Sequence, residues 1–179
     1  MGGIIIANKN LDSARKIGSV LKAYGLPVTA VCSTGSRLLE LARRVQCGVI
    51  IATLDLQDMP AQNLPRVVAG TFDFIYIARP HQSIIVESLD HLCLNMPLNK
   101  LDLFSTVKMA LSIEAPSESK IKKVLENGEI DGQAVIEKAK KKLMDRNYFT
   151  EAQAHRYLQK RSMDTCKKMT EIALIVLKY

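Results

Sequence analysis

Residues 1–113 alternate short, continuous apolar runs with amphipathic stretches of helical length, and this alternation constrains the fold more than any other feature. Runs that are apolar at consecutive positions are typical of strands buried on both faces of a parallel sheet. The amphipathic stretches between such strands then serve as crossover helices. The predicted strands are Ile4–Ala7, Val28–Val31, Val49–Ala52, Phe74–Ala78 and Leu92–Leu94. The predicted helices are Leu11–Tyr24, Ser36–Val45, Asn63–Ala69, Ser83–Leu89 and Leu101–Ile113.

Five successive strand–helix units leave few possible topologies. Connections between neighbouring parallel strands are right-handed, and a switch point after the first strand places the second strand on one side of it and the third on the other. The sequence therefore predicts a flavodoxin-like α/β domain over residues 1–113, with a parallel sheet in the order 2-1-3-4-5.

A different pattern, with apolar residues three and four positions apart, occupies the last third of the chain. Thr150 followed three residues later by Gln153 forms a capping box, which is a signal for a helix start. Arg161 joins the inner stripe of that helix by its aliphatic stem. The pattern predicts three short helices: one that Asp131 caps and that runs through Met144, one that begins at Thr150, and one over Met169–Leu177, after a polar turn at residues 164–168.

Between these two parts the sequence predicts a connection rather than a third domain. Pro116 disfavours helical geometry at Ala115, and Asn127-Gly128 is a turn signal. A short helix over residues 120–126 fits between them. We therefore predict three segments: an α/β domain at 1–113, a helical connection at 114–130, and an all-α module at 131–179.

Composition excludes several classes of protein. The chain has 47% hydrophobic residues but no apolar run long enough to span a membrane, and no secretory signal. Its four cysteines lack CxxC spacing and its three histidines are scattered, so we expect reduced cysteines, no metal site and no cofactor. Residues 1–116 hold 11 basic and 9 acidic side chains, whereas residues 117–179 hold 14 and 9. Reduced cysteines predict a cytoplasmic protein. The surplus positive charge lies on the small module, as the binding of phosphate groups would require.

The joint spacing of residues between Ala139 and Ala173 resembles the ANTAR module of AmiR- and NasR-type transcription antiterminators. Two positions depart from the family pattern: Lys141 and Tyr148 stand where glycine is usual, the second between the first two helices. ANTAR modules bind RNA hairpins in nascent transcripts, so the resemblance implies an RNA-binding protein. The matching residues are Ala139-Lys140-x-x-Leu143-Met144, Thr150-Glu151-x-x-Ala154, Leu158, Asp164, Lys168-Met169 and Ile172-Ala173.

If the resemblance holds, RNA contact falls on the exposed faces of the terminal helices. Cations there would bind phosphates, and nearby aromatic rings would stack on unpaired bases. The alternative is that these charges only form a solvated helical surface. The predicted RNA-binding residues are Lys138, Lys140, Lys141, Lys142, Arg146, Tyr148, His155, Arg156, Lys160, Arg161, Lys167 and Lys168.

The layout of residues 1–113 resembles a response-regulator receiver domain. A working receiver binds Mg²⁺ with an acidic pair after the first strand and accepts phosphate on an aspartate after the third. It also uses a hydroxyl after the fourth strand and a lysine before a proline after the fifth. In this chain those positions hold Asn8 and Lys9, then Thr53, then Ala78 or Arg79, and finally Met96.

These replacements remove the chemistry of phosphoryl transfer. An amide is a poorer ligand for a hard cation than a carboxylate, and an ammonium group repels Mg²⁺. Without the metal nothing neutralises the charge on a transferred phosphoryl group. Asp55 lies two residues after the expected acceptor position, so Asp55 as the phosphate acceptor stays an alternative. The sequence therefore predicts a degenerate phosphorylation site, a pseudo-receiver, at Asn8, Lys9, Thr53, Asp55 and Met96.

Three arrangements are open at this edge of the sheet. Lys9 and Asp55 could form an ion pair in place of the lost metal. Lys9 and Arg79 could instead hold a small anionic ligand. The third possibility is no interaction at all.

We therefore predict a non-enzymatic, phosphorylation-independent antitermination regulator derived from a two-component system. Its expected partners are RNA hairpins in 5′ leader transcripts, a second copy of the chain, and a sensor or regulatory protein. We expect no association with a membrane. The alternatives are a DNA-binding response regulator and a protein-interaction module with a basic face. A DNA reader would need Arg, Asn or Gln in the first turn of its recognition helix, where this chain has Met169-Thr170-Glu171.

Overall fold

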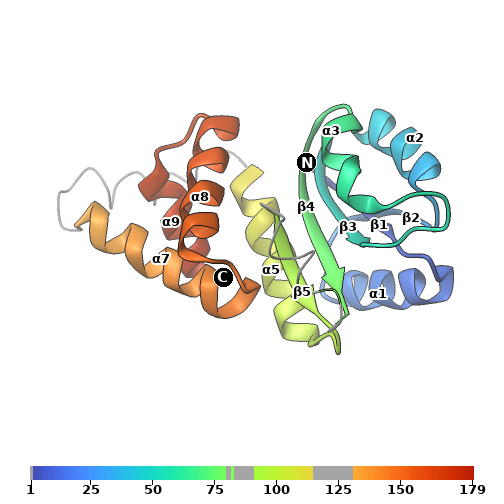
Figure 1. Cartoon of the computed structure of the whole chain (residues 1–179), viewed down its shortest axis with the longest axis horizontal. Helices are drawn as coiled ribbons and strands as arrows, with labels where there is room; N and C mark the ends of the chain where they lie inside the picture. Colours follow the sequence, from blue (N-terminus) through green and yellow to red (C-terminus); the bar gives the residue numbers. More distant parts are fainter. Residues whose placement is uncertain (1, 80–81, 83–90, 115–130) are drawn as a thin grey trace. The chain divides into compact units, whose positions relative to one another are not determined.

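A computed structural model describes residues 2–79, 82, 91–114 and 131–179 (Figure 1). The chain divides into two compact units, Met1–Leu111 and Ser112–Tyr179. The predicted helices at 83–89 and 120–126 lie outside the described residues, as does nearly all of the predicted connection. The domain limits at residues 113 and 131 therefore stay a prediction. Among the described helices, none has both the length and the apolarity of a bilayer span.

The first unit is a five-stranded parallel sheet with helices on both faces (Figure 1). The strand order is β2-β1-β3-β4-β5, which confirms the predicted order and fold class. The strands are β1 (Gly3–Ala7), β2 (Val28–Cys32), β3 (Cys47–Thr53), β4 (Thr71–Ala78) and β5 (Leu92–Asn95). The helices are α1 (Leu11–Ala23), α2 (Gly35–Val45), the 3₁₀ turn η1 (Ala61–Asn63), α3 (Leu64–Val67) and α5 (Lys100–Glu114).

The continuous apolar runs are strands whose two faces are both covered. Ile5 belongs to the core beneath α2 and α3, whereas the neighbouring Ile6 approaches Gly18 of α1 on the other face. The ring of Tyr24, at the end of α1, lies 4.8 Å from that of Phe104 on α5, so these two helices share that face. Burial of successive side chains on opposite faces explains why these runs are apolar at every position.

The predicted helix at 63–69 is shorter than expected. Val68 is already extended, and Gly70 has a φ of 106°, which is costly for any residue with a Cβ. The amide of Thr71 then donates to the carbonyl of Gln46, and β4 begins there, three residues before the predicted start. The helix therefore ends at Val67, and residues 68–70 form the turn that leads into β4.

The second unit is a small helical bundle of α7 (Gly132–Asn147), α8 (Glu151–Thr165) and α9 (Met169–Lys178). The Asp131 side chain caps α7 by accepting from the Gln133 amide. The predicted capping box at α8 is confirmed, because Thr150 Oγ1 accepts from the Gln153 amide and Gln153 Oε1 from the Thr150 amide. The helix α8 runs to Thr165, so the predicted polar turn shortens to residues 166–168. The buried apolar core holds Val135, Ile136, Ala139, Leu143, Phe149, Ala154, Tyr157, Leu158, Ile172, Ala173, Ile175 and Val176.

The loop after β3 is attached to the start of α2 by one carboxylate. Asp58 accepts hydrogen bonds from the Ser36 amide (2.9 Å), the Ser36 hydroxyl (2.7 Å) and the Gly35 amide (2.6 Å). These bonds favour the ionised form, so they lower the pKa of Asp58 from its usual 3.8 to about 2. The negative charge also lies at a helix N-terminus, where it is favourable.

We expect this carboxylate to contribute to stability at neutral pH and to lose that contribution in acid. A lowered pKa means that the contribution is complete above the unfolded-state pKa of about 3.8 and is lost as the pH falls through about 2. Thermal melting of the parent and of Asp58→Asn across this range should show a smaller decline in the variant. An identical decline in both proteins would show that Asp58 contributes nothing to acid unfolding.

Candidate nucleic-acid interface

The structure separates the twelve predicted RNA-binding residues into three groups by exposure. Lys142, Arg146 and Lys167 are half-buried, and Lys140 and Arg161 are buried. Only the exposed residues offer a surface to a large ligand. The exposed cationic set, as we call it from here, is Lys138, Lys141, Arg156, Lys160 and Lys168. Tyr148 and His155 are exposed beside it in sequence.

Lys140 does not lie on the surface, although its sequence neighbours do. Its residue is only 7% exposed, and its Nζ lies 2.8 Å from Glu137 Oε1 and 2.9 Å from Glu151 Oε1. The hydrogen bonds that Lys140 donates to Glu137 and then to Glu151 raise the pKa of Lys140. Lys140 thus joins α7 to the start of α8 through its ion pair with Glu151, and we leave Lys140 out of the proposed interface.

Arg161 is likewise buried, at 3% exposed, on the inner stripe of α8. Its guanidinium lies 3.8 Å from Asp164 within the same helix. The aliphatic stem packs inward as expected from the spacing, but the charged head follows it instead of reaching solvent. Arg161 therefore offers no exposed cation to a ligand, and we leave it out of the proposed interface.

Lys142 and Arg146 are attached to the far end of the bundle. Lys142 Nζ donates to the carbonyl of Leu177 at 3.0 Å, and Arg146 Nη1 donates to that of Tyr179 at 2.6 Å. Cations at the C-terminal end of a helix are favourable because its last carbonyls lack helical partners. Burial, and then the nearby Arg146 charge, lower the pKa of Lys142. Lys142 is therefore half-buried and joins α7 to α9, and we leave it out of the proposed interface.

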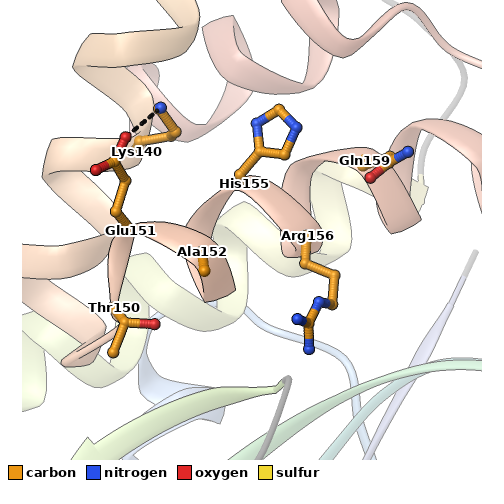
Figure 2. A pocket seen from close by; sticks show the side chains of 7 residues that line it. All are labelled: Lys140, Thr150, Glu151, Ala152, His155, Arg156 and Gln159. Carbon is orange, nitrogen blue, oxygen red and sulfur yellow. Dashed lines mark hydrogen bonds and ion pairs between the residues drawn. The ribbon is translucent and has the colours of Figure 1, made fainter.

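The first half of α8 borders an open groove of about 680 Å³ (Figure 2). Figure 2 shows Lys140 joined to Glu151 at one end of the groove, with His155 and Arg156 on α8 pointing to different sides of the helix. Gln159 lies further along, four residues after His155. Reasoning from the sequence missed Gln159, although residues three and four apart on an exposed helix face are neighbours and could have indicated it. The groove thus combines a carboxylate, an imidazole, a guanidinium and an amide, all able to contact base edges.

Tyr148 ends α7 in the left-handed conformation, with φ 58° and ψ 30°. This is the position where the family usually has glycine, and the conformation costs a residue with a Cβ on the order of 1 kcal/mol. The side chain stays 56% exposed, in contrast to the neighbouring Phe149, which packs in the bundle core. Tyr148 therefore presents an aromatic ring to solvent between α7 and α8.

A second cavity, of about 550 Å³, lies at the carboxyl edge of the sheet in the first unit. All five residues of the predicted degenerate phosphorylation site line this cavity, as does Arg79. The carboxyl ends of parallel strands are where open α/β folds bind ligands. The residues of the predicted degenerate phosphorylation site therefore line a single pocket. Its lining is Asn8, Lys9, Asn10, Ser13, Thr53, Leu54, Asp55, Ile77, Arg79, Gln82 and Met96.

Asp55 is bound by Gln82, a residue that no motif in the sequence singled out. Gln82 Nε2 donates to Asp55 Oδ2 at 2.9 Å, and Gln82 Oε1 accepts from the Arg79 amide at 3.0 Å. Within the described residues no ion pair joins Lys9 to Asp55, and the Lys9 side chain is exposed. The ion-pair alternative is therefore wrong, because a neutral amide binds one oxygen of the carboxylate while the Lys9 side chain is exposed.

Solved structures of response regulators share this fold. Full-length FixJ from B. japonicum matches with a TM-score of 0.57 at 11% identity, covering 99% of this chain and 98% of FixJ. A CheY-like receiver domain protein from Methanospirillum hungatei JF-1 matches with a TM-score of 0.50 at 12% identity, covering 62% and 94%. The receiver domain of a Saccharomyces cerevisiae response regulator, crystallised with a histidine phosphotransfer protein, gives 0.53 at 11%, covering 64% and 91%. No curated protein sequence matches the chain.

At such low identities these likenesses establish the fold alone. In fold, the chain is a receiver-like α/β unit followed by a helical unit. Residues 127–177 match the family model of the ANTAR domain. The C-terminal unit thus carries an ANTAR domain, as the spacing of its residues predicted.

Proposed function

We propose that this protein is a non-enzymatic antitermination regulator of the AmiR/NasR type, which binds hairpins in nascent leader transcripts and prevents terminator formation. The observation that carries the proposal is the ANTAR match over residues 127–177. ANTAR modules bind RNA, and the small unit holds most of the surplus positive charge of the chain. Its place of action would be the cytoplasm, where transcripts are made.

The exposed surface of the helical unit supports RNA over other ligands. The exposed cationic set supplies groups for phosphates, and Tyr148 and His155 supply rings on which unpaired bases can stack. The groove along α8 adds Gln159 and Glu151, whose amide and carboxylate can pair with base edges. Sequence-specific RNA recognition uses such contacts to splayed loop bases rather than to the stem.

The structure gives little support to the DNA-binding alternative. A recognition helix must expose its first turn to the major groove. In α9 the first-turn residue Glu171 is only 5% exposed, and Ile172, Ala173 and Ile175 are buried. A helix so deeply packed cannot enter a groove without dismantling the bundle.

A competition gel shift tests the proposal. Hairpins transcribed from the leader regions around the gene should bind the full chain, and excess duplex DNA of equal charge should not displace them. An in vitro transcription reaction should then show read-through at the matching terminator. Equal displacement by duplex DNA would favour the DNA-binding alternative. No binding to either nucleic acid would favour a protein-interaction module, with a sensor or other regulatory protein as its partner.

We further propose that phosphorylation does not control this protein. Lys9 and Arg79 line the cavity where a receiver would hold Mg²⁺, and Asp55 is already bound by Gln82. A cation at the metal position and a second one in the same cavity oppose Mg²⁺ binding. Incubation with acetyl phosphate and Mg²⁺ should therefore give no phosphoryl adduct by intact mass. A stoichiometric adduct that disappears in Asp55→Asn would contradict this and would assign Asp55 as the acceptor.

We also propose that the protein acts as a homodimer. Leu101 of α5 is 64% exposed and Met163 of α8 is 72% exposed, and apolar side chains of this size are candidates for burial between copies. Light scattering at micromolar concentration should give twice the chain mass of 19.9 kDa. A monomer that RNA does not convert to a dimer would refute the proposal.

A further inference from the structure

We propose that the cavity at the carboxyl edge of the sheet is a binding site for a small organic anion that also carries a hydroxyl or amino group. The cavity of about 550 Å³ has the volume of a small-molecule site. This inference does not require RNA binding, since it concerns the first unit alone, and it goes beyond the proposed function by assigning a ligand class.

Charge favours an anion in this cavity. Among the described residues, the ionisable side chains that line it are Lys9 and Arg79, which are cations, and Asp55, which is a carboxylate. One positive charge is therefore in surplus among these residues. Lys9 and Arg79 are both exposed, so a ligand in the cavity can reach them. A carboxylate or phosphate group would receive charge-assisted hydrogen bonds from ammonium and guanidinium donors.

Hydrogen bonds within the chain hold the polar wall of the cavity in place. Asn8 Oδ1 accepts from the Asn10 amide at 2.9 Å, and the Asn10 side chain caps the first turn of α1. Gln57 Nε2 donates to the Lys9 carbonyl at 2.9 Å, and Thr53 Oγ1 donates to the Asp55 carbonyl at 3.1 Å. The backbone on both sides is thus held in place, so a ligand would find these positions pre-organised, which lowers the entropy cost of binding.

The Asp55 carboxylate indicates which second group the ligand carries besides its anionic group. Gln82 occupies Asp55 Oδ2, and Oδ1 has no hydrogen-bond partner within the described residues. A purely anionic ligand would meet repulsion there, whereas a hydroxyl or ammonium group would donate to Oδ1. Leu54, Ile77 and Met96 complete the wall with apolar surface that suits a short carbon skeleton. The class is therefore a hydroxy acid, an amino acid or a sugar-phosphate-like ester of a few carbons.

Isothermal titration of the full chain with three probes tests the site. Malate offers carboxylates and a hydroxyl, succinate lacks only the hydroxyl, and glycerol 3-phosphate replaces carboxylate with phosphate. We expect malate or glycerol 3-phosphate to bind with a Kd of about 1 mM, which is typical of a few polar contacts. Succinate should bind about tenfold more weakly than malate. Whichever of the two hydroxylated probes binds more tightly identifies the anionic group.

Variants locate the binding within the cavity. Lys9→Gln and Arg79→Gln should each weaken the best probe about tenfold, whereas Lys16→Gln, an exposed lysine of α1 outside the cavity, should leave it unchanged. Circular dichroism confirms that each variant is folded. The proposal is overturned if neither hydroxylated probe binds at millimolar concentration, or if the Lys9 and Arg79 variants bind as the parent does. Equal binding of malate and succinate would overturn the role of Asp55.

Discussion

Replacing Arg156 and Lys160 together with glutamine is expected to weaken binding of a leader hairpin on the order of 100-fold at low salt. Both side chains are exposed, and their spacing of four residues places them on one face of α8. Each is expected to form a charge-assisted hydrogen bond to phosphate, worth roughly 1.5 to 3 kcal/mol. Gel shifts over a series of salt concentrations measure both the affinity and its salt dependence.

The salt dependence distinguishes phosphate binding from general damage. The slope of log affinity against log salt should fall by about 0.7 for each single-stranded RNA phosphate that the variant no longer neutralises, and by somewhat more for duplex stem. The matched control replaces Lys16 and Lys22, two exposed lysines of α1, with glutamine and so removes the same charge from the other unit. If both double variants bind the hairpin equally weakly, the effect is one of net charge, and the assignment of α8 as the interface fails.

Leu158→Ala is expected to unfold the ANTAR domain while the sheet unit keeps its own melting transition. Leu158 is fully buried between packed helices, and truncation of such a leucine costs about 2 to 5 kcal/mol. A domain of this size has a total stability of only about 2 to 7 kcal/mol. Differential scanning calorimetry should show the disappearance or downward shift of one transition, and RNA binding should disappear with it.

Met163→Ala is the control for this experiment, because Met163 lies on the same helix and is 72% exposed. Truncation there should change the stability by no more than about 0.5 kcal/mol. A single cooperative transition that shifts as a whole in Leu158→Ala would contradict the expected independence of the two units.

The course of the backbone was largely predictable from the sequence. Runs of consecutive apolar residues are typical of strands buried on both faces of a parallel sheet, and the rules for connections between such strands then gave the strand order. Local signals also placed the helix ends, because the capping box at Thr150 and the Asp131 cap depend on residues at most three positions apart. The helix at 63–69 was predicted too long, since the strand pairing that begins at Thr71 is not a local property.

The position of each charged side chain was decided only by the tertiary structure. Lys140 and Lys141 are neighbours of the same type, yet Lys140 is buried against Glu151, eleven positions away, while Lys141 is exposed. Lys142 and Arg146 bind carbonyl groups of Leu177 and Tyr179, at separations of 35 and 33 residues. The sequence shows where cations occur along each helix. Their long flexible side chains, however, bind whichever carboxylate or carbonyl group the packing of the helices brings within reach. For that reason the sequence determined the fold and the ANTAR family, whereas the packing of α7, α8 and α9 determined which cations remain on the surface.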